Sequence, residues 1–272
     1  MKLAVSNIAW GADDLPGHLT LARELGCDGV ELAASLIWPE PAEATAAQRK
    51  DLRARLSGSG LELVGLHALL FTRPELTLFE SPEKRAATRD YLRRMFELCR
   101  DLGGRTLVFG SPKSRRRGEL PEPEAFAVAA DFFRASAEDA RPFGVFLLIE
   151  PLSPMETDFI RSSKDGAALV ARVGHPHFRL ELDGRALAET GEDYGVFSKY
   201  HDILMHVQTS DPGLTVPGSA GVDHAPIGAA LRASGYDRFV SLEMRRDPND
   251  ADGAMRRGVQ ALREHYLGEV RA

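Results

Sequence analysis

The sequence predicts a single (β/α)8 barrel spanning residues 1–272, in which eight parallel strands alternate with helices. Short apolar runs and helical segments alternate eight times along 272 residues, close to the size that is typical of this barrel. In addition, four of the apolar runs end in a polar side chain, and a closed barrel brings such ends together at one mouth. No Gly-x-Gly-x-x-Gly turn follows a strand, which argues against a doubly wound sheet.

The first half of the chain is expected to form four strand–helix units. Asp13 and Asp14 provide the short acidic side chains that cap a helix, and Gly58 ends a later one. The loop at 68–82, which carries Phe71, is longer than most loops without a function. Strands are expected at 3–8, 29–33, 61–67 and 106–110. Helices are expected from the segment capped by Asp13 and Asp14 to about 26, and at 42–57, 83–102 and 123–143.

The second half repeats this alternation. The run at 145–150 ends in Glu150 and Pro151, and pairing should stop there because proline cannot donate a hydrogen bond to a sheet. The crossover at 184–202 is short, and its helix is less clear. Strands are expected at 145–150, 178–183, 203–208 and 239–243, with helices at 163–173, 223–234 and 250–266.

Composition excludes several classes of protein. A net charge of −6 and a pI near 5.8 argue against a nucleic-acid partner. The basic run 113–117 is interpreted as a solvated loop, with a local anion site as the alternative. Cys27 and Cys99 are expected to pack in the core, as in a protein of a reducing compartment. With no signal-peptide pattern and no apolar run near ~18 residues, we expect a cytoplasmic protein without a membrane partner.

The polar strand ends are the candidate site. Glu150, Asp183 and Glu243 each end an apolar strand, and His206 shares a strand face with Gln208 because side chains alternate with period two. Carboxylates brought within a few Å repel one another, and proteins commonly neutralise this repulsion by binding a divalent cation such as Mg²⁺ or Mn²⁺. Without a metal, at least one carboxyl should hold a proton through a raised pKa.

Short motifs along nearly the whole chain resemble the xylose isomerase-like TIM-barrel superfamily of sugar isomerases and epimerases, which includes D-tagatose 3-epimerase. No single motif is specific for this superfamily, but the order and spacing of the motifs along the chain are. They are Ser6-Asn-Ile-Ala-Trp10, Gly29-Val-Glu31, Gly110-Ser-Pro-Lys113, Ile149-Glu-Pro151, Leu182-Asp183, His206-Val-Gln208, and Gly235-Tyr236 leading to Ser241-Leu-Glu243.

This resemblance implies a metal held by a Glu, an Asp, a His and a Glu on strands five to eight. Those positions correspond to Glu150, Asp183, the His206/Gln208 region and Glu243, with the two glutamates as acid and base on opposite faces of the substrate. The chain departs from the family at Gln208, where relatives commonly carry the metal-binding His, and at residue 186, where a substrate-binding His is replaced by Ala. An amide oxygen favours a hard ion, so Mn²⁺ or Mg²⁺ is expected.

The expected activity is an isomerase or epimerase that moves a proton beside the carbonyl of a small sugar or sugar derivative. A dehydratase or lyase would use the same chemistry. An endonuclease IV-like repair enzyme and a non-catalytic sugar-binding barrel are further alternatives, and a homo-oligomer is left open. The expected substrate contacts are an apolar wall of Trp10, Phe71 and Phe109, and the polar groups His67, Lys113, Arg185 and His206.

Overall fold

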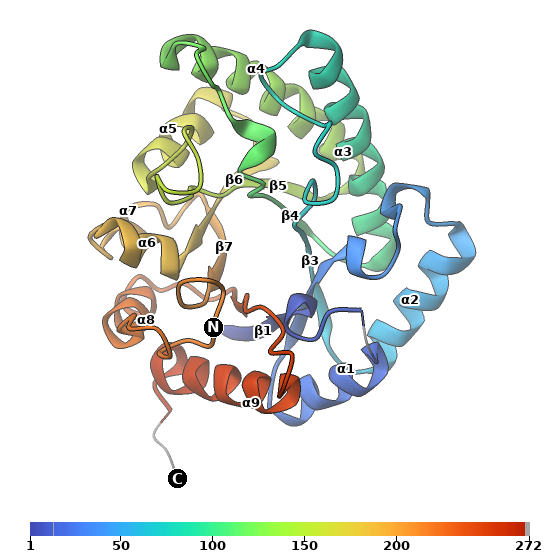
Figure 1. Cartoon of the computed structure of the whole chain (residues 1–272), viewed down its shortest axis with the longest axis vertical. Helices are drawn as coiled ribbons and strands as arrows, with labels where there is room; N and C mark the ends of the chain where they lie inside the picture. The colour runs from blue at the N-terminus through green and yellow to red at the C-terminus, as the bar shows by residue number, and fades with distance from the viewer. Residues whose placement is uncertain (13, 270–272) are drawn as a thin grey trace.

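Eight parallel strands close into one barrel, as the sequence predicts. The computed structural model describes residues 1–12 and 14–269. Neighbouring strands pair in chain order, and the last pairs with the first, so the sheet has no edge (Figure 1). The strands are β1 (Lys2–Ser6), β2 (Gly29–Ala33), β3 (Glu62–His67), β4 (Thr106–Phe109), β5 (Phe146–Ile149), β6 (Phe178–Asp183), β7 (Leu204–Thr209) and β8 (Phe239–Leu242).

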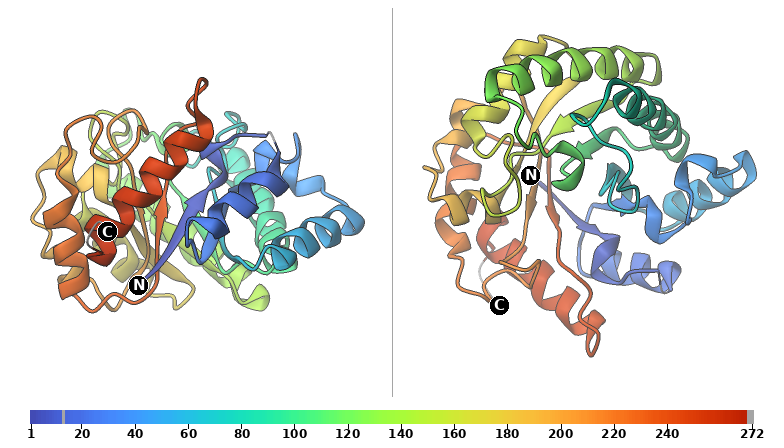
Figure 2. Two further views of the ribbon diagram at one scale, coloured as in Figure 1. Left: turned by 90° about the horizontal axis from the view of Figure 1, so that it is seen from below. Right: turned by 45° about the horizontal axis from the view of Figure 1, so that its top comes forward.

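The helices form an outer layer around these strands, as two further views show (Figure 2). Asp14 caps the first helix by accepting a hydrogen bond from the Gly17 amide, whereas Asp13, expected to share that role, lies outside the described residues. The helices are α1 (Leu15–Glu24), α2 (Ala46–Gly58), α3 (Pro82–Leu102), α4 (Glu122–Ala140), α5 (Ser163–Val173), α6 (Gly184–Thr190), α7 (Val196–Lys199), α8 (His224–Ala233) and α9 (Ala251–Leu262).

Two helical regions differ from expectation. Helix α2 begins at Ala46 rather than at 42, because Thr45 and Gln48 form a capping box that fixes its start. The residues before it form a separate turn, Pro41–Glu43. The unclear crossover after β6 holds two short helices, α6 and α7.

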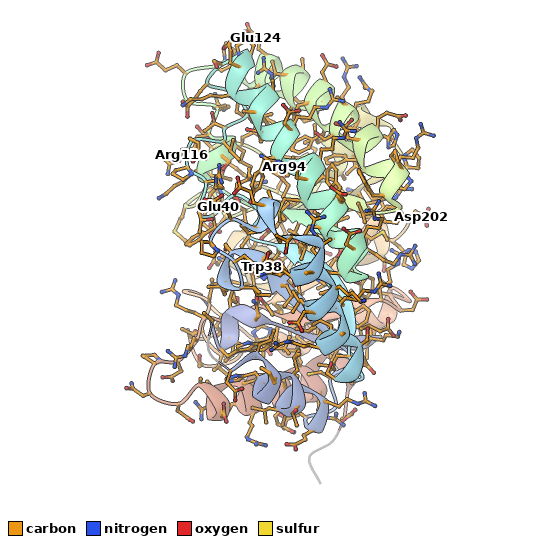
Figure 3. The ribbon with its side chains drawn as sticks, turned by 90° about the vertical axis from the view of Figure 1, so that its right-hand side faces the viewer. Trp38, Glu40, Arg94, Arg116, Glu124 and Asp202 are labelled. Carbon is orange, nitrogen blue, oxygen red and sulfur yellow. The ribbon has the colours of Figure 1, made fainter. Side chains whose placement is uncertain are left out.

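Most of the apolar core lies between the strands and the helices. Cys27 and Cys99 are free and buried there, as expected, and burial raises the pKa of Cys27 to about 12. Charged side chains cover the outer helices, including Arg94 on α3 and Glu124 on α4 (Figure 3). None of the helices in the described ranges is long and apolar enough to cross a membrane.

The barrel wall leaves no room for a side chain at Gly65 on β3. A Cβ atom there would lie 2.0 Å from the carbonyl oxygen of Thr106 on β4. We therefore expect Gly65→Ala to lower the free energy of unfolding by about 3 kcal/mol, the upper end of the usual range for overpacking. Denaturant unfolding followed by circular dichroism measures this.

Gly58→Ala is the matched control. Gly58 is the last residue of α2, and a Cβ atom there would meet nothing within 4 Å. Its stability should stay within about 1 kcal/mol of wild type, on the stabilising side, because Ala favours a helix. Equal stability of the two variants would contradict the packing argument.

Candidate active site

A cavity of about 430 Å³ opens at the carboxyl-terminal ends of the strands. Its mouth lies among the loops that follow the strands, on the side of the barrel where Glu40 and Arg116 lie in Figure 3, with Asp202 at the opposite end. The polar lining is mostly charged, and the apolar lining comes from the loops. The titratable residues are His67, Glu150, Glu156, Arg185, Glu243 and Arg245, and the larger apolar residues are Ile8, Leu36, Phe71, Leu152 and Leu214.

Glu150 follows β5 directly, where Pro151 ends the pairing as expected. Its carboxylate takes the space beside Gly110, since a Cβ atom at 110 would lie 1.7 Å from Glu150 Oε2. Arg115 Nη1 donates to the Glu150 carbonyl oxygen at 2.6 Å and holds the strand end from below. Burial, followed by the negative charges of Glu243 and Asp183, raises the pKa of Glu150 well above its ordinary value.

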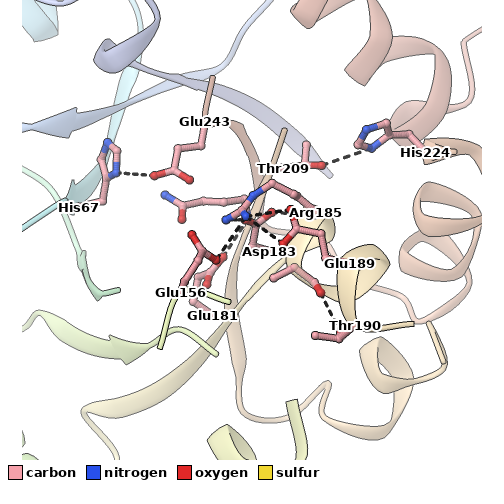
Figure 4. Close-up of polar contacts among 12 residues, drawn as sticks. His67, Glu156, Glu181, Asp183, Arg185, Glu189, Thr190, Thr209, His224 and Glu243 are labelled. Carbon is pink, nitrogen blue, oxygen red and sulfur yellow. Dashed lines mark hydrogen bonds and ion pairs between the residues drawn. The ribbon is translucent and has the colours of Figure 1, made fainter. Parts of the chain in front are cut away.

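Glu243 follows β8 and has a different environment. Its Oε1 lies 3.1 Å from Nδ1 of His67 (Figure 4). The other ring nitrogen of His67, Nε2, is 2.6 Å from the hydroxyl oxygen of Ser6. Burial alone would lower the pKa of His67, but the charges of Glu31 and Glu243 and the hydrogen bond to Glu243 raise it above its ordinary value. The contact with His67 therefore orients the Glu243 carboxylate at the cavity.

Asp183 ends β6 and is buried against Arg185. It accepts a hydrogen bond from the Arg185 amide at 2.9 Å, and its Oδ2 lies 3.0 Å from the guanidinium. The same guanidinium contacts Glu156 at 3.3 Å and Glu189 at 3.2 Å, so three carboxylates surround one cation (Figure 4). Burial raises the pKa of Asp183 to about 7, although Arg185 opposes the rise.

A second polar layer lies inside the barrel beneath these groups. His206 Nε2 is 3.2 Å from Glu31, and the Gln208 amide nitrogen donates to the same carboxylate at 2.9 Å. The Gln208 backbone amide donates to Glu181 at 3.1 Å. Although burial would raise it, the charges of His206 and His67 hold the pKa of Glu31 at about 2, while burial and the nearby carboxylates raise that of Glu181.

The oxygen donors at the strand ends suit a hard divalent ion. Because Gln208 Nε2 bonds to Glu31, its Oε1 is a buried oxygen with no hydrogen-bond partner among the described residues. Glu150, Asp183 and Glu243 stand at or directly after the ends of their strands, so the donors available there are all oxygens. Counting only His, Cys, Asp and Glu, the described ranges hold no group of three placed to bind one ion, so Glu150, Asp183 and Glu243 do not surround a single point in this structure.

Four expected substrate contacts lie elsewhere. Trp10 is buried with its ring stacked on His18, and Phe109 points outward against Phe132 and Phe133 of α4. Lys113 is exposed and does not line the cavity. His206 lies one layer too deep and lines a different cavity, of about 600 Å³, at the other end of the barrel. The expected residues His67, Phe71 and Arg185 do line the mouth cavity.

The sequence interpretation missed several charged residues of the site. Arg115 is fully buried, so the solvated-loop interpretation of the basic run fails at this residue. Glu156 and Arg245 reach the cavity from loops, where no periodicity marks them. Glu31 was only a motif residue and Glu181 only a face neighbour of Asp183, although a carboxylate within an apolar strand was an available signal for both.

Curated relatives that match most of the chain are carbohydrate-type enzymes. A human protein named "Putative hydroxypyruvate isomerase" is 26% identical over 252 residues, covering 88% of this chain and 87% of its own. L-ribulose 3-epimerase of Mesorhizobium japonicum is 25% identical, covering 89% and 80%. Inosose dehydratase of Geobacillus thermodenitrificans is 23% identical, covering 91% of each chain.

Comparison with solved structures and with family models agrees on the fold. The structure of the IolI protein with a bound zinc atom has a TM-score of 0.81, with 18% identity and complete coverage of both chains. The model of the family described as "Xylose isomerase-like TIM barrel" matches residues 19–265. The chain therefore belongs to the xylose isomerase-like TIM barrel family.

Proposed function

We propose that the protein is an isomerase or epimerase of a small sugar or sugar derivative, acting by proton transfer at a carbon beside a carbonyl. The observation that carries this proposal is the pair Glu150 and Glu243. The two carboxylates line one cavity from β5 and β8, which lie apart around the barrel, and their surroundings differ. A pair of carboxyls in unlike environments is suited to divide acid and base roles.

In this mechanism Glu243 is the base and Glu150 is the acid. His67, which is held from below by Ser6, orients the Glu243 carboxylate. Glu243 removes the proton beside the carbonyl, and Glu150, whose raised pKa keeps a proton available, delivers one from the other side of the cavity. The outcome is a ketose–aldose shift or an inverted carbon, depending on where the proton returns.

The oxygen of the enediolate requires positive charge. Arg185 lines the cavity and can donate to a substrate oxygen while it holds Asp183. We propose Mn²⁺ or Mg²⁺ as the bound ion, held by Glu150, Asp183, Gln208 and Glu243, where it would polarise the substrate carbonyl. The buried free thiols Cys27 and Cys99 suit a reducing compartment, and we place the enzyme in the cytoplasm.

A dehydratase is the second candidate, favoured by the match to inosose dehydratase over most of both chains. The first step would be the same proton removal by Glu243. Glu150 would then protonate a leaving hydroxyl at the next carbon, and water would depart. Mass spectrometry of the product separates the two reactions, because elimination lowers the substrate mass by one water and isomerisation leaves it unchanged.

Glu150→Gln and Glu243→Gln should each lower kcat by about 10²- to 10⁴-fold, because the amide keeps the shape and removes the proton-transferring group. Turnover of candidate ketoses by the purified variants measures this, with circular dichroism as the check on folding. Glu62→Gln, at the opposite end of the barrel, is the matched control and should retain activity. Near-normal turnover in either site variant would remove the two-glutamate mechanism.

Solvent exchange provides an independent test of proton transfer. Substrate incubated with the enzyme in deuterated water should gain deuterium at the carbon beside the carbonyl, since an enediolate formed by Glu243 exchanges its proton with solvent. Nuclear magnetic resonance of the recovered sugar locates the label. Full retention of the original hydrogen would point instead to a hydride shift or a shielded base.

Chelation tests the metal. We expect exhaustive chelation to lower activity, and added Mn²⁺ or Mg²⁺ to restore it better than Zn²⁺, because the four donors are all oxygens. Gln208→His should tighten binding of transition metals, as measured by calorimetry with Mn²⁺ and Zn²⁺. Undiminished activity in chelator would contradict the metal, and Arg185 alone would then supply the positive charge that stabilises the enediolate oxygen.

A further inference from the structure

Arg245 occupies the rim of the cavity, two residues beyond Glu243. Between them Met244 is fully buried and packs toward Gly258 of α9, on the side away from the cavity. Because side chains alternate along an extended chain, Arg245 returns to the same side as Glu243. It is exposed, and it lines both the 430 Å³ cavity and a neighbouring one of about 980 Å³ beside α9.

The backbone at Arg245 is held in place by the preceding loop. Its amide donates to the carbonyl oxygen of Leu214 at 2.6 Å. Leu214 belongs to a tight turn built around the buried carboxylate of Asp211, which accepts bonds from the Gly218 amide at 2.9 Å and from His224 Nε2 at 2.7 Å. Because the backbone of Arg245 is already fixed, binding a ligand at the rim would order only its side chain.

Arg245 differs from the other cations of the cavity in having no carboxylate of its own. Arg185 is shared among three carboxylates, and His67 is bonded to Glu243. Within the part of the chain that the structure describes, no ion pair or hydrogen bond involves the Arg245 guanidinium. The cavity therefore has a negatively charged floor with neutralised cations and one unpaired cation at its rim.

We propose that the substrate carries a terminal anion, a carboxylate or a phosphate, which the Arg245 guanidinium binds at the rim while the keto end reaches Glu150 and Glu243. This inference rests on the proposed function and adds the substrate class. Repulsion from the carboxylates of the floor excludes an anion there and orients the substrate with its charge outward. The planar fork of arginine matches both carboxylate and phosphate with two parallel hydrogen bonds.

Binding of non-reacting probes tests the site without turnover. Glycerate, glycerol 3-phosphate and neutral glycerol are titrated by calorimetry into wild type, Arg245→Gln and Arg256→Gln. Arg256, exposed on α9, lines only the neighbouring cavity and is the matched control for loss of one charge. We expect one or both anions to bind the wild type at least about tenfold more tightly than glycerol, and Arg245→Gln to weaken them about 10- to 100-fold.

The pattern across variants decides the outcome. Arg256→Gln should leave anion affinity unchanged, and Arg245→Lys should retain part of it, since it keeps the charge and loses the fork. Tighter binding of glycerate would indicate that the terminal anion of the substrate is a carboxylate, and tighter binding of glycerol 3-phosphate would indicate a phosphate. Anion binding within twofold of wild type in Arg245→Gln, equal weakening by Arg256→Gln, or no preference for anions over glycerol in the wild type would each overturn the proposal.

Turnover separates this inference from the proposed function. Arg245→Gln should raise the KM for hydroxypyruvate or D-fructose 6-phosphate about 10- to 100-fold and leave kcat and the KM for neutral D-fructose unchanged. Equal KM changes for charged and neutral substrates overturn the anion site while the isomerase assignment stands. If no keto compound is turned over but Arg245-dependent anion binding persists, the proposed function fails and the anion site stands.

Discussion

The burial of several carboxylates in the upper half of the barrel is the constraint on which the rest of the site depends. An isolated buried carboxylate is costly, and it persists only with a partner or as the neutral acid. Glu31 is matched by His206 and Gln208, and Asp183 by Arg185. Burial, followed by the charges of neighbouring carboxylates, raises the pKa values of Glu150 and Glu181 well above the ordinary value. The fold thus places beside the cavity a carboxyl, Glu150, whose pKa lies well above its ordinary value.

This polar interior changes where the stability of the barrel comes from. Barrels of this kind usually fill their interior with layers of branched apolar side chains. Here the apolar contacts concentrate between strands and helices, where Phe109 of β4 and Phe178 of β6 pack against Phe133 of α4. Because the outer layer stabilises the barrel, the inner layers are free to hold charges at fixed positions. Buried Arg115 shows the cost of the arrangement, since burial lowers its pKa to about 10 while it still retains its charge near neutral pH.

Alternation, strand order and the strand-end carboxylates could be predicted because they depend on local patterns, and proline after Glu150 marked the end of β5. Side-chain direction was less accessible. A strand covered on both faces is apolar throughout, so period two did not show that Phe109 faces the helices. The sequence also did not show how deep each polar side chain lies in the barrel. A register shift in β6 sets His206 opposite Glu181 and Gln208 opposite Asp183, and only the second pair lies at the strand ends. Arg115 and Arg245 depend on loop conformation, which carries no periodic signal.

In the proposed mechanism, chemistry and specificity lie on different parts of this barrel. Glu150, Asp183 and Glu243 stand at or directly after strand ends, where the paired backbone limits their movement. Phe71, Leu214 and Arg245 come from loops whose length and sequence can change without disturbing strand pairing. The same floor can therefore serve an isomerase, an epimerase or a dehydratase, and the rim decides which molecule presents its carbonyl to it. At the rim, an apolar side lies next to the Arg245 guanidinium, which has no ionic partner among the described residues. Under the proposal this arrangement favours a short substrate whose two ends differ in charge.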